Sequence, residues 1–368
     1  MMKVAYFALG ETYNSSHAGF VHTYNIVKAL SKYVQIRLFI RGTHQKTDIP
    51  ATFVSLPSIT IENPVKYMKS YINLKSELKK FDLIHERFHI NPVDLFFVKS
   101  KKYILEVNDP APIIYSGLKK RLYSKIIQRK FNRADAIITQ TNTLKKILSK
   151  FYSGEIHVVP NGLDVKFFEK NMYQFDIRKK YGISKEQLVI TFIGSFREWH
   201  GVQNIPSMAE EIGKDYEDAV FLLVGSGPLF EKVQGKGIKN IILTGSLPYD
   251  NIPSILAQSD ILIAPFNTKR FISLEKYGFY WCPVKLFEYM YSGKPIVSYD
   301  YEEIKNITKG AALFAKPGDV HDFIKNIRKL IDDKNLRKKL GNQGKRIAKN
   351  YDWTNRAKEI LKIYREIL

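Results

Sequence analysis

The most informative run of the chain is Cys282-Pro283-Val284-Lys285-Leu286-Phe287-Glu288-Tyr289-Met290, followed by Ser292-Gly293-Lys294-Pro295. Proline suits the first turn of a helix, so we expect a helix to begin at Pro283. Glu288 then falls about a turn and a half into that helix. A carboxylate there can accept hydrogen bonds from both hydroxyls of a ribose, and Lys285 near the helix start can meet a phosphate. The alternative is that both are solvated helix residues.

On both sides of this run, short apolar strands alternate with amphipathic helices. This pattern predicts parallel sheets covered by helices on both faces. A first series has a helix at 18–31 and strands at 4–9, 35–40, 82–84, 103–107, 136–139 and 156–159. A second series has a helix at 202–212 and strands at 188–193, 219–224, 241–244, 261–264 and 295–298. Two series joined around 160–180 predict two doubly wound domains, in which ligands bind to the loops that follow the strands.

Length and composition agree with this organisation. A chain of 368 residues exceeds the size at which a single core keeps growing. Its 45% hydrophobic content is that of a globular protein, and no apolar run approaches the roughly 20 residues of a spanning helix. The apolar N-terminus is interpreted as a buried strand and not as a secretion signal. The single cysteine, Cys282, excludes an intramolecular disulfide and fits a reducing cytosol.

The chain is strongly basic, with a net charge of +22. Residues 1–163 carry 25 basic against 11 acidic residues, and residues 164–368 carry 33 against 25. Phosphorylated ligands, an anionic membrane and nucleic acid are all compatible with this charge. A nucleic-acid-binding protein should show basic and aromatic readout elements or a helix-turn-helix, and the sequence shows neither. We therefore expect no nucleic-acid partner.

Glycine turns follow three strands of the second series. In Gly194-Ser195-Phe196-Arg197-Glu198-Trp199-His200-Gly201, a glycine turn is followed by Arg197, whose fixed fork of donors suits a diphosphate. His200 is alternatively a structural cap or a core residue. Gly225 and Leu247 belong to the turns Val224-Gly225-Ser226-Gly227 and Thr244-Gly245-Ser246-Leu247, which tight strand-to-helix connections explain equally well.

These motifs together resemble family 4 of the glycosyltransferases. The run at 283–290 is similar to the donor-site helix of that family in the variant P-x-K-L-F-E-Y-M, which implies that Glu288 contacts the ribose. The family usually has a second glutamate, which contacts the sugar, eight positions earlier, where this chain has Tyr280. Glu275, in Glu275-Lys276-Tyr277-Gly278-Phe279, resembles the family's E-x-F-G run displaced by a local insertion.

The resemblance also covers the glycine turns. The turn at 194–201 resembles the family variant G-S-F-R-x-W-H-G, which implies that Arg197 and Lys285 act on the diphosphate, with Gly194 and His200 beside it. Gly225 and Leu247 lie in turns that resemble family turns, the second of which holds the nucleobase. The run Val158-Val159-Pro160-Asn161-Gly162-Leu163-Asp164 resembles the domain junction, and Tyr351-Asp352-Trp353 the start of the last helix.

In the N-terminal half, the family usually has two adjacent glycines near the start of the first helix, and this chain has Ala18-Gly19, with only the second glycine present. Free backbone N–H groups at a helix start can bind an anionic group of the donor. Ser15 or Ser16 as a plain N-cap is compatible with this reading. The runs at 85–89 and 105–110 resemble the E-R and E-V-N runs of the family. Asn108 and Asp109 are candidates for the reacting centre, with helix capping as the alternative. His17, Glu86 and Arg87 are the candidate residues on the acceptor side.

The resemblance, which spans Gly10 to Trp353, implies the GT-B fold. This is an α/β fold of two Rossmann-like doubly wound domains facing a central cleft, with a C-terminal helix crossing back. The expected domains are an acceptor-side domain at 1–165, a nucleotide-sugar-binding domain at 166–351 and the returning helix at 352–368.

The implied activity is retaining, metal-independent transfer of a hexose from a nucleotide sugar to a hydroxyl of a glycan or lipid-linked acceptor. The nucleotide sugar is a co-substrate, and no cofactor is expected. No metal is expected either, because no Asp-x-Asp pair lies in a suitable loop and Asp332-Asp333 belongs to a charged helical region. The alternatives are a non-catalytic or epimerase-like protein of this fold and a basic nucleic-acid-binding protein.

A basic helix is predicted at residues 117–133. Leu118, Leu122, Ile126 and Ile127 recur there at helical spacing among seven cations, Lys119, Lys120, Arg121, Lys125, Arg129, Lys130 and Arg133. This pattern is typical of a helix that lies on an anionic membrane. The alternative is that the apolar stripe packs on the N-terminal sheet. We expect a cytoplasmic protein, with a possible peripheral site at the cytoplasmic leaflet.

Overall fold

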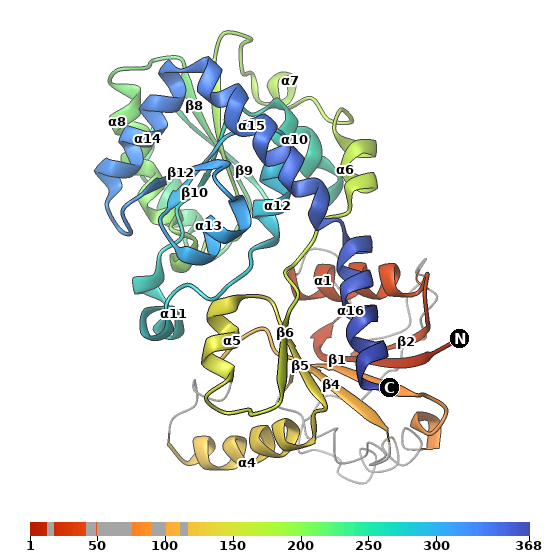
Figure 1. The fold of residues 1–368 in the computed structure, drawn as a ribbon. Coiled ribbons are helices and arrows are strands. Elements are labelled where there is room, and N and C mark those ends of the chain that lie inside the picture. The colour runs from red at the N-terminus through yellow and green to blue at the C-terminus, as the bar shows by residue number, and fades with distance from the viewer. Residues whose placement is uncertain (13–17, 42–48, 50–75, 90–100, 111–116) are drawn as a thin grey trace. The chain divides into compact units, whose positions relative to one another are not determined.

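The computed structural model describes residues 1–12, 18–41, 49, 76–89, 101–110 and 117–368. The chain divides into two compact units, one made of Met1–Asn161 with Trp353–Leu368 and the other of Gly162–Asp352. Each unit contains a six-stranded sheet with helices on both faces (Figure 1). All the strand pairs in both sheets are parallel. The α/β class and the doubly wound organisation predicted from the alternation of elements are confirmed.

The sheet of the first unit has the order β2-β1-β3-β4-β5-β6. Its strands are β1 (Lys3–Thr12), β2 (Gln35–Arg41), β3 (Leu83–Arg87), β4 (Lys102–Glu106), β5 (Ala136–Thr139) and β6 (Glu155–Val158). The helices described in this unit are α1 (Ala18–Leu30), α4 (Gly117–Arg133), α5 (Asn142–Leu148) and α16 (Trp353–Ile367). Alternate residues of β1, namely Val4, Tyr6 and Ala8, share one core with apolar residues of α1 and α16. The last helix therefore completes the core of the first unit.

Strand β3 is longer than the sequence predicts. Its predicted end is at residue 84, but the strand continues to Arg87. His85 and Glu86 are buried within it, 0% and 2% exposed. These polar residues remain in the strand because each has buried bonding partners, which removes most of the cost of taking a polar group out of water.

The sheet of the second unit has the order β12-β11-β10-β7-β8-β9. Its strands are β7 (Leu188–Ile193), β8 (Ala219–Val224), β9 (Ile241–Gly245), β10 (Ile261–Ala264), β11 (Ile296–Tyr299) and β12 (Ala312–Ala315). Its α-helices are α6 (Val165–Asn171), α7 (Ile177–Tyr181), α8 (Ile205–Gly213), α9 (Phe230–Gln234), α10 (Ile252–Gln258), α11 (Ile272–Tyr277), α12 (Val284–Tyr291), α13 (Glu302–Thr308), α14 (Val320–Asp332) and α15 (Lys334–Ala348). Of these strands, β12 has no counterpart in the sequence prediction.

Successive residues of a central strand point into two different cores. Leu222 of β8 packs with α10 and α12, whereas Phe221 and Leu223 pack with α8 and α14. Burial on both faces explains why these strands appear in the sequence as continuous apolar runs. The helix predicted at 202–212 begins as a separate 3-10 turn at Val202–Asn204, and α8 follows with a proline in its first turn.

Candidate functional site

Three neighbouring strands of the second unit end in glycine turns that are bonded to one another. The N–H of Gly194 donates to the carbonyl of Val224, and that of Gly225 to the carbonyl of Gly245, both at 2.9 Å. Gly194 has a φ of +154°, a value that favours glycine. A Cβ atom at Gly194 would lie 2.7 Å from Nζ of Lys285. The turn after β7 therefore lies directly against the lysine of α12.

Lys285 lies in an aromatic environment beside a histidine. Its Nζ is 3.4 Å from Nδ1 of His200 and lies 4.7 Å and 5.0 Å from the ring centroids of Phe192 and Phe266. Burial lowers the pKa of Lys285 to about 7, against the opposing influence of the Glu288 carboxylate. Burial, together with the charges of Lys285 and Arg197, lowers the pKa of His200 to about 2. His200 is thus neutral near pH 7, and a negatively charged ligand would favour the charged form of Lys285.

Glu288 lies one turn further along α12 and is 6% exposed. The hydroxyl of Tyr249 donates a hydrogen bond of 2.6 Å to its Oε1. Burial raises the pKa of Glu288, while the Tyr249 bond and the Lys285 charge act in the opposite direction. The ring of Tyr249 is stacked on Phe167, with centroids 5.0 Å apart. The carboxylate is therefore held in one orientation by a fixed tyrosine.

The other predicted residues of this unit are not buried beside Lys285 and Glu288. Arg197 is exposed, and its guanidinium lies 5.1 Å from the ring centroid of Trp199. Glu275 is exposed on α11, and Leu247 is half-buried against the core. Tyr280 is 1% exposed, and its hydroxyl lies 2.6 Å from Oγ of Ser273. Position 280 therefore belongs to the core.

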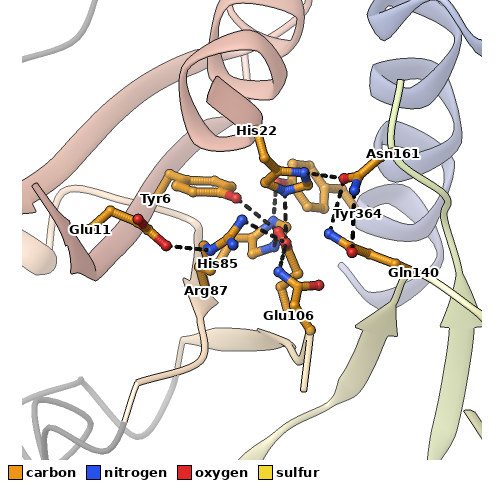
Figure 2. A network of polar contacts seen from close by, with 10 residues as sticks. Tyr6, Glu11, His22, His85, Arg87, Glu106, Gln140, Asn161 and Tyr364 are labelled. Carbon is orange, nitrogen blue, oxygen red and sulfur yellow. Dashed lines mark hydrogen bonds and ion pairs between the residues drawn. The ribbon is translucent and has the colours of Figure 1, made fainter. Parts of the chain in front are cut away.

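In the first unit a buried polar network surrounds the carboxylate of Glu106, at the end of β4 (Figure 2). Its closest partners are Nε2 of His22 at 2.7 Å, Nδ2 of Asn108 at 2.7 Å and the hydroxyl of Tyr6 at 2.8 Å. Nε2 of His85 at 3.2 Å and Nη1 of Arg87 at 3.7 Å complete the set. Burial alone would raise the pKa of Glu106, but His22, His85 and Arg87 lower it well below its usual value.

Two histidines extend this network to other elements. Nδ1 of His22 lies 2.7 Å from Oδ1 of Asn161, which also accepts a bond of 3.0 Å from Gln140. Nδ1 of His85 lies 2.7 Å from the hydroxyl of Tyr364 on α16 (Figure 2). The carboxylate of Glu106 thus connects the sheet with α1, with α16 and with the last residue before the second unit.

Two of the predicted residues in the first unit, Arg87 and Gly19, are connected through Glu11. Nε of Arg87 is 3.3 Å from Oε1 of Glu11. A Cβ atom at Gly19 would lie 2.2 Å from the same oxygen. The Glu11 carboxylate therefore lies against the start of α1, beside the position expected for an anion of the ligand. Sequence reasoning did not identify Glu11.

Glu86 is in a different position from the one predicted. It was expected in a loop after the strand, but it lies within β3, where Nζ of Lys130 and the hydroxyl of Tyr103 bond to its carboxylate. The buried ion pair explains this position, and we assign Glu86 to the anchoring of α4. Asp109 is exposed after β4. His17 lies outside the described residues.

Several residues of these sites carry no sequence signal that would have identified them. Tyr249 lies 39 positions before Glu288, and Tyr364 lies 279 positions after His85. Phe192 and Phe266 are strand and loop residues that look like ordinary core. Within the described residues, no group of three or more histidine, cysteine or acidic side chains is placed to hold a metal ion.

Comparison with known proteins gives two family matches along the chain. Residues 19–167 match the model described as "Glycosyltransferase Family 4", and residues 174–347 match "Glycosyl transferases group 1". An uncharacterised glycosyltransferase of Methanocaldococcus jannaschii is 26% identical over 89% of this chain and 86% of its own length. A subunit of phosphatidylinositol N-acetylglucosaminyltransferase from Saccharomyces cerevisiae is 22% identical over 69% of this chain and 55% of its own.

Solved structures show the same fold. The Anabaena HepE protein, solved in complex with UDP and glucose, has a TM-score of 0.74 over 100% of both chains at 13% identity. The two-domain architecture expected from the motifs is therefore shared with a known nucleotide-binding protein.

Proposed function

This chain is a family 4 glycosyltransferase of the GT-B fold, an enzyme of nucleotide-sugar-dependent glycosyl transfer, and from this premise we propose which residues carry the reaction. The second unit binds the donor. Lys285 and Arg197 meet the diphosphate, with Gly194 and His200 beside it, and Glu288 accepts the ribose hydroxyls. The observation that supports this most directly is the position of Lys285, whose Nζ lies against the Gly194 turn and 3.4 Å from a neutral His200.

The proposed transfer proceeds with retention and without a metal ion. The acceptor oxygen forms a bond to the anomeric carbon on the face from which the diphosphate leaves, and the hydroxyl proton passes to a diphosphate oxygen. Negative charge develops on the leaving nucleoside diphosphate, and Lys285 and Arg197 stabilise it. Gly225 and Leu247 border the nucleotide, and Glu275, exposed on α11, is our candidate for contact with the sugar. We propose Asn108 and Asp109 at the reacting centre and Arg87 on the acceptor side.

The test is incubation of the full chain with UDP-, GDP- and dTDP-sugars, with proton NMR of the released or transferred sugar. We expect donor hydrolysis with one nucleotide, an anomeric configuration retained in the product, and unchanged rates in EDTA. Lys285→Ala and Arg197→Ala should each lower turnover by about one to three orders of magnitude. A strict requirement for Mg²⁺ or Mn²⁺ would contradict the proposed mechanism, and so would an inverted product.

We further propose that the protein works in the cytoplasm, peripherally at the cytoplasmic leaflet, on a glycan or lipid-linked acceptor. The support is the basic character of α4, on which Lys125 is exposed. Part of the apolar stripe of α4 packs within its own unit, because Ile127 and Phe131 are 3% and 1% exposed, and Lys130 is paired with Glu86. The described end of α4 therefore leaves Lys125 for electrostatic contact with lipid. None of the helices in the described part of the chain is long and apolar enough to span a bilayer.

Vesicle co-sedimentation at low salt tests this proposal. Lys119, Lys120, Arg121 and Lys125 changed together to Glu should weaken sedimentation with anionic vesicles, since each basic residue contributes on the order of 1 kcal/mol near such a surface. Equal sedimentation of this variant and the wild type would remove α4 from the proposal and leave the assigned activity intact.

A further inference from the structure

Helix α15, Lys334–Ala348, is the most basic element of the second unit. Seven cations and no acidic residue lie between Asp333 and Asp352. Its buried side consists of Leu340, Gly341, Gly344 and Ala348. A Cβ atom at Gly341 would lie 1.9 Å from the carbonyl oxygen of Gly293, two residues after the end of α12. The glycine therefore lets α15 lie in close contact with the segment that carries Lys285 and Glu288 (Figure 1).

The cations of α15 are concentrated on its outer side. At about 100° per residue, five of them and Lys349, which directly follows the helix, fall within one face of about 140°. Lys334, Lys338, Lys339, Arg346 and Lys349 are exposed, and Lys345 is half-buried. Two polar residues, Asn335 and Asn342, occupy the rest of this face and are exposed. The seventh cation, Arg337, is turned inward and donates to the carbonyl of Ile331 at 2.8 Å.

These six cations differ in their partners from cations of the helices that precede and follow α15 along the chain. Arg328 of α14 pairs with Glu211 and Asp215, and Lys362 of α16 pairs with Glu366. In the part of the chain that the structure describes, none of these six has a carboxylate within 4.0 Å. No ion pair in the described part of the chain therefore neutralises them, although Nζ of Lys345 lies 5.7 Å from the ring centroid of Tyr291.

The helix itself gains nothing from the cations in its first half. Lys334 and Lys338 are four residues apart, a spacing at which like charges destabilise a helix. Lys334 is also the first residue of α15, at the positive end of the helix dipole, where acidic residues are stabilising. The cations near the end of the helix, Lys345 and Arg346, suit the dipole, but Lys334, Lys338 and Lys339 do not. Their presence favours a partner outside the chain.

We propose that this cationic face of α15 docks the donor unit on a layer of anionic lipid headgroups. Five of its six cations are lysines, whose compact, hydrated charge suits a diffuse negative surface, whereas bidentate recognition of individual phosphates favours arginine. No residue of α15 is aromatic, so the face offers no platform on which nucleobases can stack. No apolar side chain projects from it either, so the contact is electrostatic adsorption without insertion. Because α15 packs beside α12, adsorption would fix the orientation of the donor site to the membrane.

The test compares two triple variants of the full chain, Lys334→Glu/Lys338→Glu/Lys339→Glu on α15 and Lys232→Glu/Lys236→Glu/Lys239→Glu as the matched control. The control lysines are exposed in the same unit, on α9 and in the segment between α9 and β9, which is the opposite edge strand from β12. The two variants undergo the same change in net charge. Both are sedimented with phosphatidylserine-rich vesicles at low and high salt, and with neutral phosphatidylcholine vesicles.

We expect the α15 variant to partition onto phosphatidylserine vesicles on the order of a hundredfold more weakly than the control variant. The wild type should be released by high salt. The melting temperature of the α15 variant should not fall, because glutamates suit the first turns of a helix. Equal partitioning of the two variants would overturn the proposal, and so would binding of the wild type to RNA or heparin without binding to vesicles. The result does not depend on the proposed activity, since donor hydrolysis is measured separately.

Discussion

At the scale of single residues, the hydrogen bond from Tyr249 to Glu288 gives the donor assignment a specific consequence. Glu288→Gln keeps the size of the side chain but removes the charge that ribose hydroxyls would bond to. We expect donor binding to weaken by about 1–3 kcal/mol, as measured by calorimetry. Glu169→Gln is a matched control, because Glu169 accepts a similar bond of 2.6 Å from Tyr291 in the same unit. Equal donor affinity in the Glu288 variant and the wild type would remove Glu288 from the site.

Lys285 makes donor binding dependent on pH. Burial lowers its pKa to about 7 in the free protein, so the side chain loses its charge as the pH rises above 7. A diphosphate binds the charged form, and binding above pH 7 therefore requires uptake of a proton. The donor Kd should be constant below pH 7 and rise by up to about tenfold per pH unit above it. His200 does not titrate in this window, since its pKa is lowered to about 2.

The measurement is calorimetry with a nucleotide sugar between about pH 6 and 9, a range that brackets the lowered pKa of Lys285 of about 7. Buffers of different ionisation enthalpy report the proton that is taken up on binding. Lys285→Arg is the informative variant, because arginine stays charged throughout this range. Its donor affinity should be independent of pH. A pH dependence that persists in Lys285→Arg would show that another group is responsible.

Sequence reasoning at this scale succeeds where a residue type is tied to a local motif. The helix around Lys285 and Glu288 and the turn at Gly194 follow from local patterns, and the structure brings Gly194, His200 and Lys285 together. Tyr249 belongs to a separate turn, and nothing in its surroundings indicates that it bonds to Glu288. Whether an aromatic side chain is core or site depends on its distant neighbours, which local sequence does not contain.

At the scale of secondary-structure elements, Glu106 connects β4 with β1, β3, α1 and α16 through one buried carboxylate. Glu106→Gln removes the charge that His22 and Arg87 face in the interior. We expect the free energy of unfolding at pH 7 to fall by about 3–5 kcal/mol, the range for breaking a buried charge pair. The variant should remain folded, because the amide can still accept the bond from Tyr6.

The pH dependence of this loss has a defined sign. The pKa of Glu106 is lowered well below 4.5 in the folded chain, so its stabilisation is complete above pH 4.5 and is lost as the pH falls below that value. The difference in stability between wild type and Glu106→Gln should therefore shrink on acidification, as followed by denaturant unfolding. Glu155→Gln, at a carboxylate that is 74% exposed and pairs with His157 at 3.3 Å, should change stability by less than about 1 kcal/mol. A constant difference for Glu106→Gln would contradict the pKa assignment.

The element boundaries show what local patterns cannot contain. Three polar residues after Ile84 predict the end of a strand, but β3 continues because Glu86 meets Lys130 and His85 meets Tyr364, partners that are far away in the sequence. The strand at Ala312–Ala315 is half alanine, a residue depleted in strands, so its composition gives no strand signal. Both differences arise from tertiary contacts that override local propensity.

At the scale of the whole molecule, the alternation of strands and helices was sufficient to predict two doubly wound sheets. Where the chain passes between the units depends on contacts that no local pattern contains. The backbone N–H of Leu163 donates a hydrogen bond of 3.0 Å to the carbonyl of Tyr351. The segment that enters the second unit and the segment that leaves it therefore run side by side within that unit. Trp353 then packs with its ring 5.4 Å from that of His22 in the first unit.

Two units with separate cores should respond to the donor differently. A ligand that binds only one folded unit stabilises that unit, by about 2.7 kcal/mol when its concentration is a hundred times its Kd. Hydrogen exchange of the full chain should therefore slow by up to about a hundredfold in the regions that open with the donor site, with the largest effect at the turns after β7, β8 and β9 and at the start of α12. The central strands β1, β3 and β4 of the first unit should change least.

Lys285→Ala should abolish the protection in the second unit while leaving exchange of the first unit unchanged. Protection confined to residues 1–161 would place the donor in the first unit and overturn the assignment of both sites.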